Sequence, residues 1–108
     1  MTLIIFMVQT KEQVLGLLRQ HQRRLKGFGV KRCGLFGSFL SGHPRPDSDV
    51  DLLIEFEPDQ KTFDNFMHLA FFLEETFGRR VDLLTPESLS KHIGPNILRE
   101  VEYAAIGA

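Results

Sequence analysis

Cysteine and tryptophan are almost missing from this chain: Cys33 is the only cysteine among 108 residues, and there is no tryptophan. One cysteine cannot form an internal disulfide, which excludes a small disulfide-stapled fold. Cys33 lies in the apolar run from Val30 to Phe36, a setting typical of a buried strand thiol in a reducing cytoplasm. Stability must therefore come from a hydrophobic core, and 43% hydrophobic residues can supply one.

The chain also lacks an excess of charge of either sign, because 13 Lys and Arg stand against 14 Asp and Glu. No overall basic field exists to hold nucleic acid or an anionic membrane, so stable nucleic-acid binding is not expected. No internal repeat, linker or low-complexity stretch divides the sequence. These features predict a single domain over residues 1–108.

Long hydrophobic runs are absent as well. The apolar stretch at residues 2–8 is much shorter than the 18 or more residues of a membrane span, and no basic region precedes it. The sequence therefore predicts a cytoplasmic protein without a membrane segment. The stretch is compatible with a short extra strand, or with leader residues 1–6 ahead of a native start at Met7.

Hydrophobic periodicity predicts an α/β (α+β) domain with alternating helices and strands. Thr10 and Thr62 are the expected N-caps of the first two helices, and Gly78 is the expected end of the second. The predicted helices cover residues 11–27, 62–77 and 96–105, with a short helical segment at residues 86–88, and the predicted strands cover residues 30–36, 49–56 and 80–85.

Three aspartates form the constellation with the clearest chemistry. Asp49 and Asp51 are two apart in a strand, so both leave the same face, with Cα atoms roughly 6.5 Å apart. Asp82 lies in a later apolar strand that would be about 4.8 Å away if the two strands pair. Such a carboxylate cluster suits two Mg²⁺ ions that hold the attacking and leaving oxygens of a displacement at phosphorus.

Gly37 and Ser38 supply a complementary feature. Glycine allows the backbone to approach a phosphate closely, and the N–H and hydroxyl of Ser38 can donate to it at a helix N-terminus. Ten residues separate this pair from Asp49 and Asp51. Each motif is weak alone, but the joint pattern of Gly-Ser, Asp-x-Asp and a third strand aspartate is specific.

This pattern resembles the minimal nucleotidyltransferase family of the DNA polymerase β-like nucleotidyltransferases, over about residues 28–103. The resemblance implies a small mixed β-sheet flanked by helices, with Asp49 and Asp51 binding both metal ions and Asp82 binding one beside the incoming hydroxyl. It implies that Gly37 and Ser38 hold the triphosphate while a nucleoside monophosphate, AMP from ATP in the expected case, is transferred to a hydroxyl. Many small members resemble antitoxins that adenylylate a tyrosine of a HEPN-type toxin.

One position departs from the family pattern. Family members often carry Ala-Arg-Gly after Gly-Ser-Phe, whereas this chain has Leu40, Ser41 and Gly42. We expect Arg45 to approach the triphosphate in place of the missing arginine. The departure leaves open an antitoxin that blocks its partner without catalysis. A separate alternative is an enzyme that acts on a small molecule, although 108 residues leave little room for a dedicated acceptor pocket.

The second helix predicts a partner surface. Its expected core stripe leaves Phe72 on the opposite side, because successive helical residues turn by about 100°. We therefore expect Phe72 to face away from the core and this helix to pack on a toxin-like partner or on a second copy of the chain. The alternative is a helix that the segment around Leu98 and Val101 buries on nearly all sides. The expected core stripe consists of Phe63, Phe66, Met67, Ala70, Leu73 and Phe77.

Overall fold

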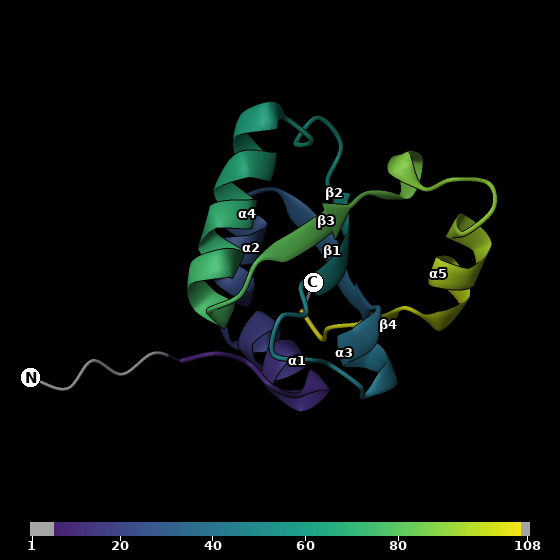
Figure 1. Ribbon diagram of the computed structural model, residues 1–108. Coiled ribbons are helices and arrows are strands. Elements are labelled where there is room, and N and C mark those ends of the chain that lie inside the picture. The colour runs from purple at the N-terminus through teal and green to yellow at the C-terminus, as the bar shows by residue number, and fades with distance from the viewer. Residues whose placement is uncertain (1–5, 107–108) are drawn as a thin grey trace, which may run out of the picture.

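Four strands form one mixed sheet in the order β3-β2-β1-β4 in the computed structural model, which describes residues 6–106 (Figure 1). The central strands β1 (Val30–Phe36) and β2 (Val50–Phe56) are antiparallel, whereas β3 (Val81–Leu84) runs parallel to β2 and β4 (Glu102–Tyr103) antiparallel to β1. Helix α4 (Phe63–Phe77) makes the crossover between the parallel strands. The predicted fold class, a small mixed sheet flanked by helices, is confirmed.

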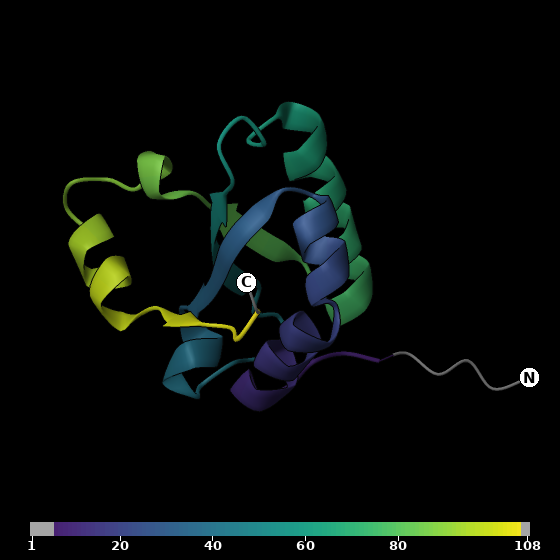
Figure 2. The ribbon, with the colours of Figure 1, turned by 180° about the vertical axis from the view of Figure 1, so that it is seen from behind.

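The helices α1 (Lys11–Gln20), α2 (Gln22–Gly27) and α4 cover one face of the sheet, as both ribbon views show (Figures 1 and 2). Val50, Leu52 and Ile54 of β2 point toward these helices and are fully buried, as their alternation predicts. Burying each such side chain contributes about 1.5–3 kcal/mol. The α/β core between sheet and helices therefore holds β2 in place, and β2 carries Asp51 and directly follows Asp49.

Local sequence signals set most element ends. The Thr10 hydroxyl accepts a hydrogen bond from the Gln13 N–H at 3.1 Å, and the Thr62 hydroxyl accepts one from the Asn65 N–H at 3.1 Å. Gly78 ends α4 with φ 69°. The single first helix predicted over residues 11–27 is two helices instead, because the backbone of His21, with φ −102° and ψ 23°, leaves the helical region between α1 and α2.

The C-terminal part differs from the prediction of a helix over residues 96–105. Helix α5 (Gly94–Glu100) ends early, and Val101 turns the chain into β4. Gly34 explains this ending, because a Cβ there would overlap Val101 and touch the Tyr103 ring. Without a side chain at this position, β4 can pair closely with β1. The short predicted helix at residues 86–88 is present as the 3-10 helix η1 (Pro86–Ser88).

The predicted core stripe of α4 is confirmed in part, because Leu73 and Phe77 are buried and Phe66 and Ala70 pack against the core. Leu69, Leu73 and Phe77 are the buried residues, while the Phe63 side chain is 78% exposed. The expectation that Phe72 faces away from the core is wrong. The reason is that α2 lies beside α4 and covers that side of the helix, which sequence periodicity within α4 does not show.

The Phe72 ring is half-buried between α2 and α4. It lies 5.7 Å from the Phe28 ring and 5.5 Å from the His21 ring, with the Arg24 guanidinium 4.6 Å from its centroid. The neighbouring Phe71 side chain, by contrast, is 60% exposed. Helix α5 lies on the far side of the sheet from α4, so the alternative that the C-terminal segment buries α4 is also wrong (Figure 1).

The N-terminal apolar run is only partly described, since residues 2–5 lie outside the described part of the chain. Residues 6–8 form no strand, although Val8 is buried and its N–H donates to the Phe77 carbonyl at 2.9 Å. None of the helices within residues 6–106 combines the length and apolar character needed to cross a membrane. Cys33 is buried as predicted, and burial raises the pKa of its thiol to about 12.

Candidate active site

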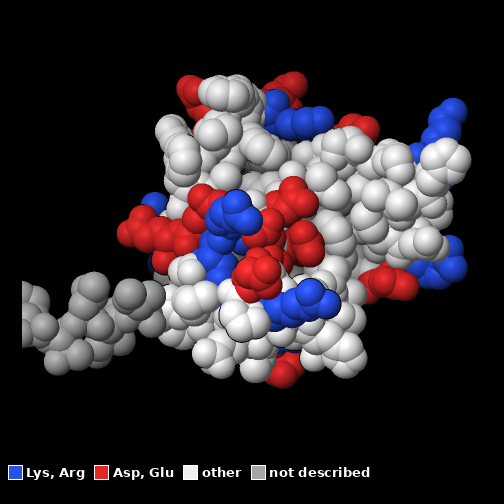
Figure 3. All heavy atoms as spheres, viewed as in Figure 1, with Lys and Arg blue, Asp and Glu red and all other residues white. Residues whose placement is uncertain are grey.

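The backbone places the three predicted aspartates at one end of the strand pair β2 and β3. Asp51 and Asp82 are direct partners in the parallel register, as the sequence analysis supposed. Asp49 immediately precedes β2 and shares the face of Asp51 because the two residues are two apart. Figure 3 shows acidic side chains gathered over this part of the sheet with basic side chains beside them. The topology thus brings the carboxylates of residues 33 positions apart in sequence onto neighbouring strands.

Gly37 lies directly against this cluster. The last residue of β1, Phe36, pairs with Asp51, so the following turn passes beside the Asp51 carboxylate. A Cβ on Gly37 would overlap the carboxylate Oδ2 of Asp51, and the residue has φ 76°. Only glycine fits this position without strain.

Ser38 opens the short helix α3 (Ser38–Ser41) directly after Gly37. The buried Phe39 ring anchors this turn in the core. The two predicted phosphate-binding residues, Gly37 and Ser38, therefore stand beside the aspartates, as the joint sequence pattern requires.

The carboxylate of Asp51 lies in an unfavourable electrostatic environment. Burial raises its pKa to about 6, with further contributions from the nearby charges of Asp82 and Asp49. Leu53, two residues along the same face, is also buried, with only 1% of its surface exposed. The site therefore holds an ionisable group at the margin of an apolar patch, next to two like charges.

Among the described residues, 6–106, Asp49 is the one aspartate of the cluster with a cationic partner. The Nε of Arg80 lies 3.4 Å from Oδ1 of Asp49, and both side chains are largely exposed. Within residues 6–106, no hydrogen bond or ion pair joins the Asp82 carboxylate to another side chain. A structural role for Asp82 as the ion-pair partner of Arg79 or Arg80 is therefore not supported.

The donor chemistry of the cluster fits a hard divalent cation, since it consists of carboxylate oxygens that repel each other without one. In the described part of the chain, no three His, Cys, Asp or Glu side chains converge as a ready-made metal site. The residues that could hold Mg²⁺ are thus brought together by the backbone, with the carboxylates left unneutralised by close basic partners apart from Arg80.

The loop between the two motifs carries Arg45, whose side chain is exposed. Its backbone N–H donates to the Ser48 hydroxyl at 2.7 Å, which folds the loop back on itself. A hollow of about 260 Å³ beside this loop is lined by residues that include Asp49, Arg79 and Arg80. Sequence reasoning considered Arg79 and Arg80 only as partners of Asp82 and did not place them beside Asp49 and this loop.

Comparison with known proteins identifies the family. The sequence model of the nucleotidyltransferase domain matches residues 16–106. The chain belongs to the nucleotidyltransferase family. The protein adenylyltransferase MntA of Thermococcus cleftensis is 40% identical to it over 95 residues, which cover 87% of this chain and 95% of that protein. The resemblance drawn from the Gly-Ser and Asp-x-Asp motifs is confirmed.

Solved structures place this nucleotidyltransferase among the minimal members of the family. A structure solved as a candidate minimal nucleotidyltransferase is 33% identical, covers 82% of this chain and 93% of its own, and superposes with a TM-score of 0.66. A crystal structure of a toxin–antitoxin with AMP-PNP shares the fold, with a TM-score of 0.62, 21% identity and coverage of 89% of this chain and 73% of its own. The chain is therefore a minimal nucleotidyltransferase, an enzyme of the transferase class.

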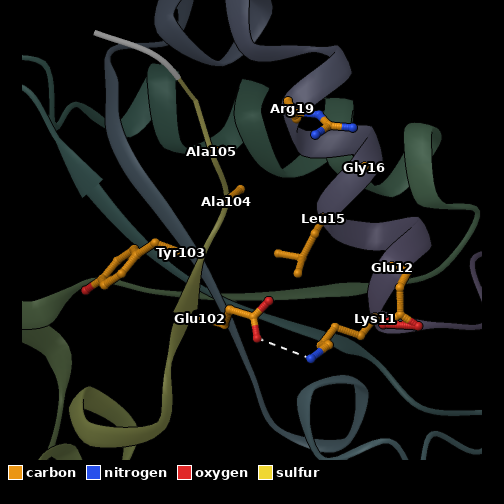
Figure 4. Close-up of a pocket in the computed structure, with 9 residues that line it drawn as sticks. All are labelled: Lys11, Glu12, Leu15, Gly16, Arg19, Glu102, Tyr103, Ala104 and Ala105. Carbon is orange, nitrogen blue, oxygen red and sulfur yellow. Dashed lines mark hydrogen bonds and ion pairs between the residues drawn. The ribbon is translucent and has the colours of Figure 1, made fainter.

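The nucleotidyltransferase also has a hollow of about 500 Å³ between α1 and the C-terminal segment. Figure 4 shows Leu15 pointing into it and the ion pair of Lys11 with Glu102 at its edge, with Nζ and Oε1 3.2 Å apart. None of the three aspartates lines this hollow. Its chemistry therefore differs from that of the acidic cluster, and it offers no concentration of metal-binding oxygens.

Proposed function

We propose that this nucleotidyltransferase transfers AMP from ATP to a hydroxyl group of a protein partner, with two Mg²⁺ ions as cofactors. The observation that carries the proposal is the pairing of Asp51 with Asp82 beside Gly37. The pairing gathers these carboxylates against the bare backbone of Gly37, which lets the Asp51 carboxylate lie close to the turn. Metal ions would stabilise the charged form of Asp51, whose pKa is raised by burial and, to a smaller extent, by the charges of Asp82 and Asp49.

The residues of the site divide the work of the reaction. We assign Asp49 and Asp51 to both Mg²⁺ ions and Asp82 to one of them, while Gly37 and Ser38 hold the triphosphate through their backbone and hydroxyl groups. The bound ions supply neutralisation of the phosphate charges and of the pyrophosphate that leaves. Arg45 from the loop and Arg80 from beside Asp49 are the nearby cations available to the outer phosphates.

Asp82 has a second proposed role as general base. As the acceptor oxygen attacks the α-phosphorus, Asp82 takes the hydroxyl proton, and the bond from that phosphorus to the bridging oxygen of pyrophosphate breaks. Asp82→Asn should lower the turnover by about 10²–10⁴-fold, because this is the usual contribution of a positioned base. Binding of ATP with Mg²⁺ should change much less, and unchanged turnover in the variant would remove this role.

The acceptor we propose is a tyrosine of a HEPN-type toxin, so that the chain acts as the antitoxin in the cytoplasm. Two observations support a protein acceptor: the 40% identical relative is named a protein adenylyltransferase, and the fold occurs in a toxin–antitoxin structure with AMP-PNP. A protein partner would also supply the acceptor-side wall that a short chain has little room to build. A small-molecule acceptor and a purely steric antitoxin are the competing functions.

Co-expression with the product of the neighbouring gene tests the proposal. The purified pair, incubated with ATP and Mg²⁺, should yield a partner whose intact mass has increased by one AMP, and peptide analysis should place the AMP on tyrosine. The double variant Asp49→Asn with Asp51→Asn is the control and should leave the mass unchanged. Toxin neutralisation by the double variant without any mass increase would favour the steric alternative.

A further inference from the structure

The side chain of Arg79 makes an unusual number of contacts for a residue at a strand entrance. Its Nε donates to the Val8 carbonyl at 2.7 Å, and its Nη1 donates to the carbonyls of Arg45 at 3.2 Å, Pro46 at 2.8 Å and Ser48 at 3.2 Å. Its Cζ also lies 5.1 Å from the centroid of the Phe39 ring. A single half-buried guanidinium thus donates hydrogen bonds to four backbone carbonyls and makes one cation–π contact.

These contacts connect the two motifs of the active site. Phe39 belongs to α3, which begins at Ser38, and Ser48 immediately precedes Asp49. The loop between them is otherwise closed mainly by its own bonds, from the Arg45 N–H to the Ser48 hydroxyl and from the Ser48 N–H to the Arg45 carbonyl at 3.0 Å. Those bonds shape the loop, but Arg79 attaches it to the rest of the molecule.

Arg79 is also fixed from its own side. It follows Gly78 directly, and the chain then enters β3, where the Val50 N–H donates to the Arg80 carbonyl at 3.0 Å. The backbone of Arg79 is therefore held beside the start of β2, while its side chain spans the loop. Lysine could not replace it, because an ammonium on a flexible stem lacks the planar fork that reaches several carbonyls at once.

We propose that Arg79 is a positioning residue that fixes the loop 45–48 and thereby sets the position of Asp49 beside Asp51 and Asp82. The inference rests on the proposed function of this site in Mg²⁺-dependent nucleotide binding. The proposed role of Arg79 is to place the metal-binding aspartates and not to contact the substrate, because its guanidinium donates to backbone carbonyls. Loss of such an outer contact typically weakens metal binding by about 10–100-fold.

The test compares Arg79→Lys with the matched control Arg32→Ala. Arg32 also donates twice, to Glu55 at 2.9 and 2.7 Å, and stacks 4.2 Å from the Tyr103 ring, but it lies at the other end of the sheet. ATP binding is measured by calorimetry over a range of Mg²⁺ concentrations. The half-saturating Mg²⁺ concentration should rise about 10–100-fold in Arg79→Lys and stay within about twofold of wild type in Arg32→Ala.

Hydrogen exchange of the metal-free protein gives a second, activity-independent readout. In Arg79→Lys the amides of residues 45–50 should exchange faster, whereas amides in the centre of β1 and β2 should keep their protection. Ser48→Ala, which loosens the same loop by deleting the acceptor of the Arg45 N–H, should shift the Mg²⁺ requirement in the same direction and serves if Arg79→Lys fails to fold.

The outcomes separate the two levels of inference. Wild-type protein that binds ATP equally with and without Mg²⁺ would overturn the proposed function and the role of Arg79 with it. Wild-type protein with a clear Mg²⁺ requirement that is unchanged in both Arg79→Lys and Ser48→Ala would overturn the positioning role alone. A third outcome would show that Arg79 only supports the fold. In it, amides across the whole sheet of Arg79→Lys lose protection from hydrogen exchange, while Ser48→Ala binds ATP with the same half-saturating Mg²⁺ concentration as wild type.

Discussion

The two faces of β2 contrast sharply in what they contribute. The face toward the helices carries Val50, Leu52 and Ile54, all fully buried, and it supplies stabilisation. The other face begins with Asp49 and Asp51, whose charges repel each other and that of Asp82. One strand thus combines a face that stabilises the fold with a face that reduces its stability, and the second kind of face is typical of a site retained for binding or catalysis.

A substitution in the core that packs against the buried face of β2 should have the largest effect on stability. Phe77→Ala removes a fully buried ring at the end of α4 and should lower the free energy of unfolding by about 3–5 kcal/mol. Urea unfolding followed by circular dichroism measures the change. A loss below about 1 kcal/mol would contradict the placement of Phe77 in the core.

Adding a side chain at Gly37, beside the acidic face of β2, should have the second largest effect on stability. Gly37→Ala places a Cβ against the Asp51 carboxylate at a residue with φ 76°, so we expect a loss of about 1–3 kcal/mol in unfolding free energy. Calorimetry should also show that Mg²⁺-dependent ATP binding is lost. The matched control is Gly42→Ala, which has a similar φ of 85° but no neighbouring atom in the way. Equal effects on ATP binding in both variants would contradict a specific role for the space at Gly37.

Neutralising Asp51 should stabilise the metal-free protein. Its folded-state pKa of about 6 lies above the ordinary value of 3.8, so its contribution to stability is most favourable below about pH 4 and is lost as the pH rises through 6. Asp51→Asn should therefore raise the unfolding free energy at pH 8 by about 1 kcal/mol, after allowance for solvent screening at this half-exposed group.

Urea unfolding of wild type and Asp51→Asn between pH 4 and pH 8 measures the effect of this carboxylate. The difference between the two proteins should grow with pH and shrink when Mg²⁺ is added to wild type. A variant that is less stable than wild type at pH 8 would show that the carboxylate supports the fold.

The outer side of α4 should be the least sensitive region. Phe71→Ser alters a 60% exposed side chain, so the unfolding free energy should change by no more than about 0.5 kcal/mol. Phe72→Ser is the matched control and should lose more, because α2 and the Arg24 guanidinium cover that ring. Size-exclusion chromatography of Phe71→Ser with the partner also tests whether this side of α4 takes part in binding.

The features predicted best from the sequence are those set by residues close together in the chain, such as strand faces and helix ends. Alternation in β2 put Asp49 and Asp51 on one face, and the threonine caps and Gly78 set the ends of α1 and α4. The register of Asp51 with Asp82 needed one further assumption, that an apolar strand after a crossover helix pairs in parallel with the strand before it.

Tertiary contacts account for the errors. The orientation of Phe72 depends on α2, which belongs to another part of the sequence, and β4 forms because Gly34 on β1 leaves room for Val101. The role inferred for Arg79 depends on carbonyls more than 30 residues away, and backbone acceptors have no signature in a sequence. Local patterns therefore located the acidic cluster but not the contacts that hold its loop.

The central claim, that the acidic face of β2 serves metal-dependent nucleotide binding and not the fold, is tested most directly by thermal unfolding of wild type and the double variant Asp49→Asn with Asp51→Asn. Without ligand, the double variant should melt at the same temperature or higher. Saturating Mg²⁺ with ATP should raise the melting temperature of wild type by about 5 °C or more and leave the double variant unchanged. A double variant that melts several degrees lower without ligand, or an equal rise in both proteins, would contradict the account.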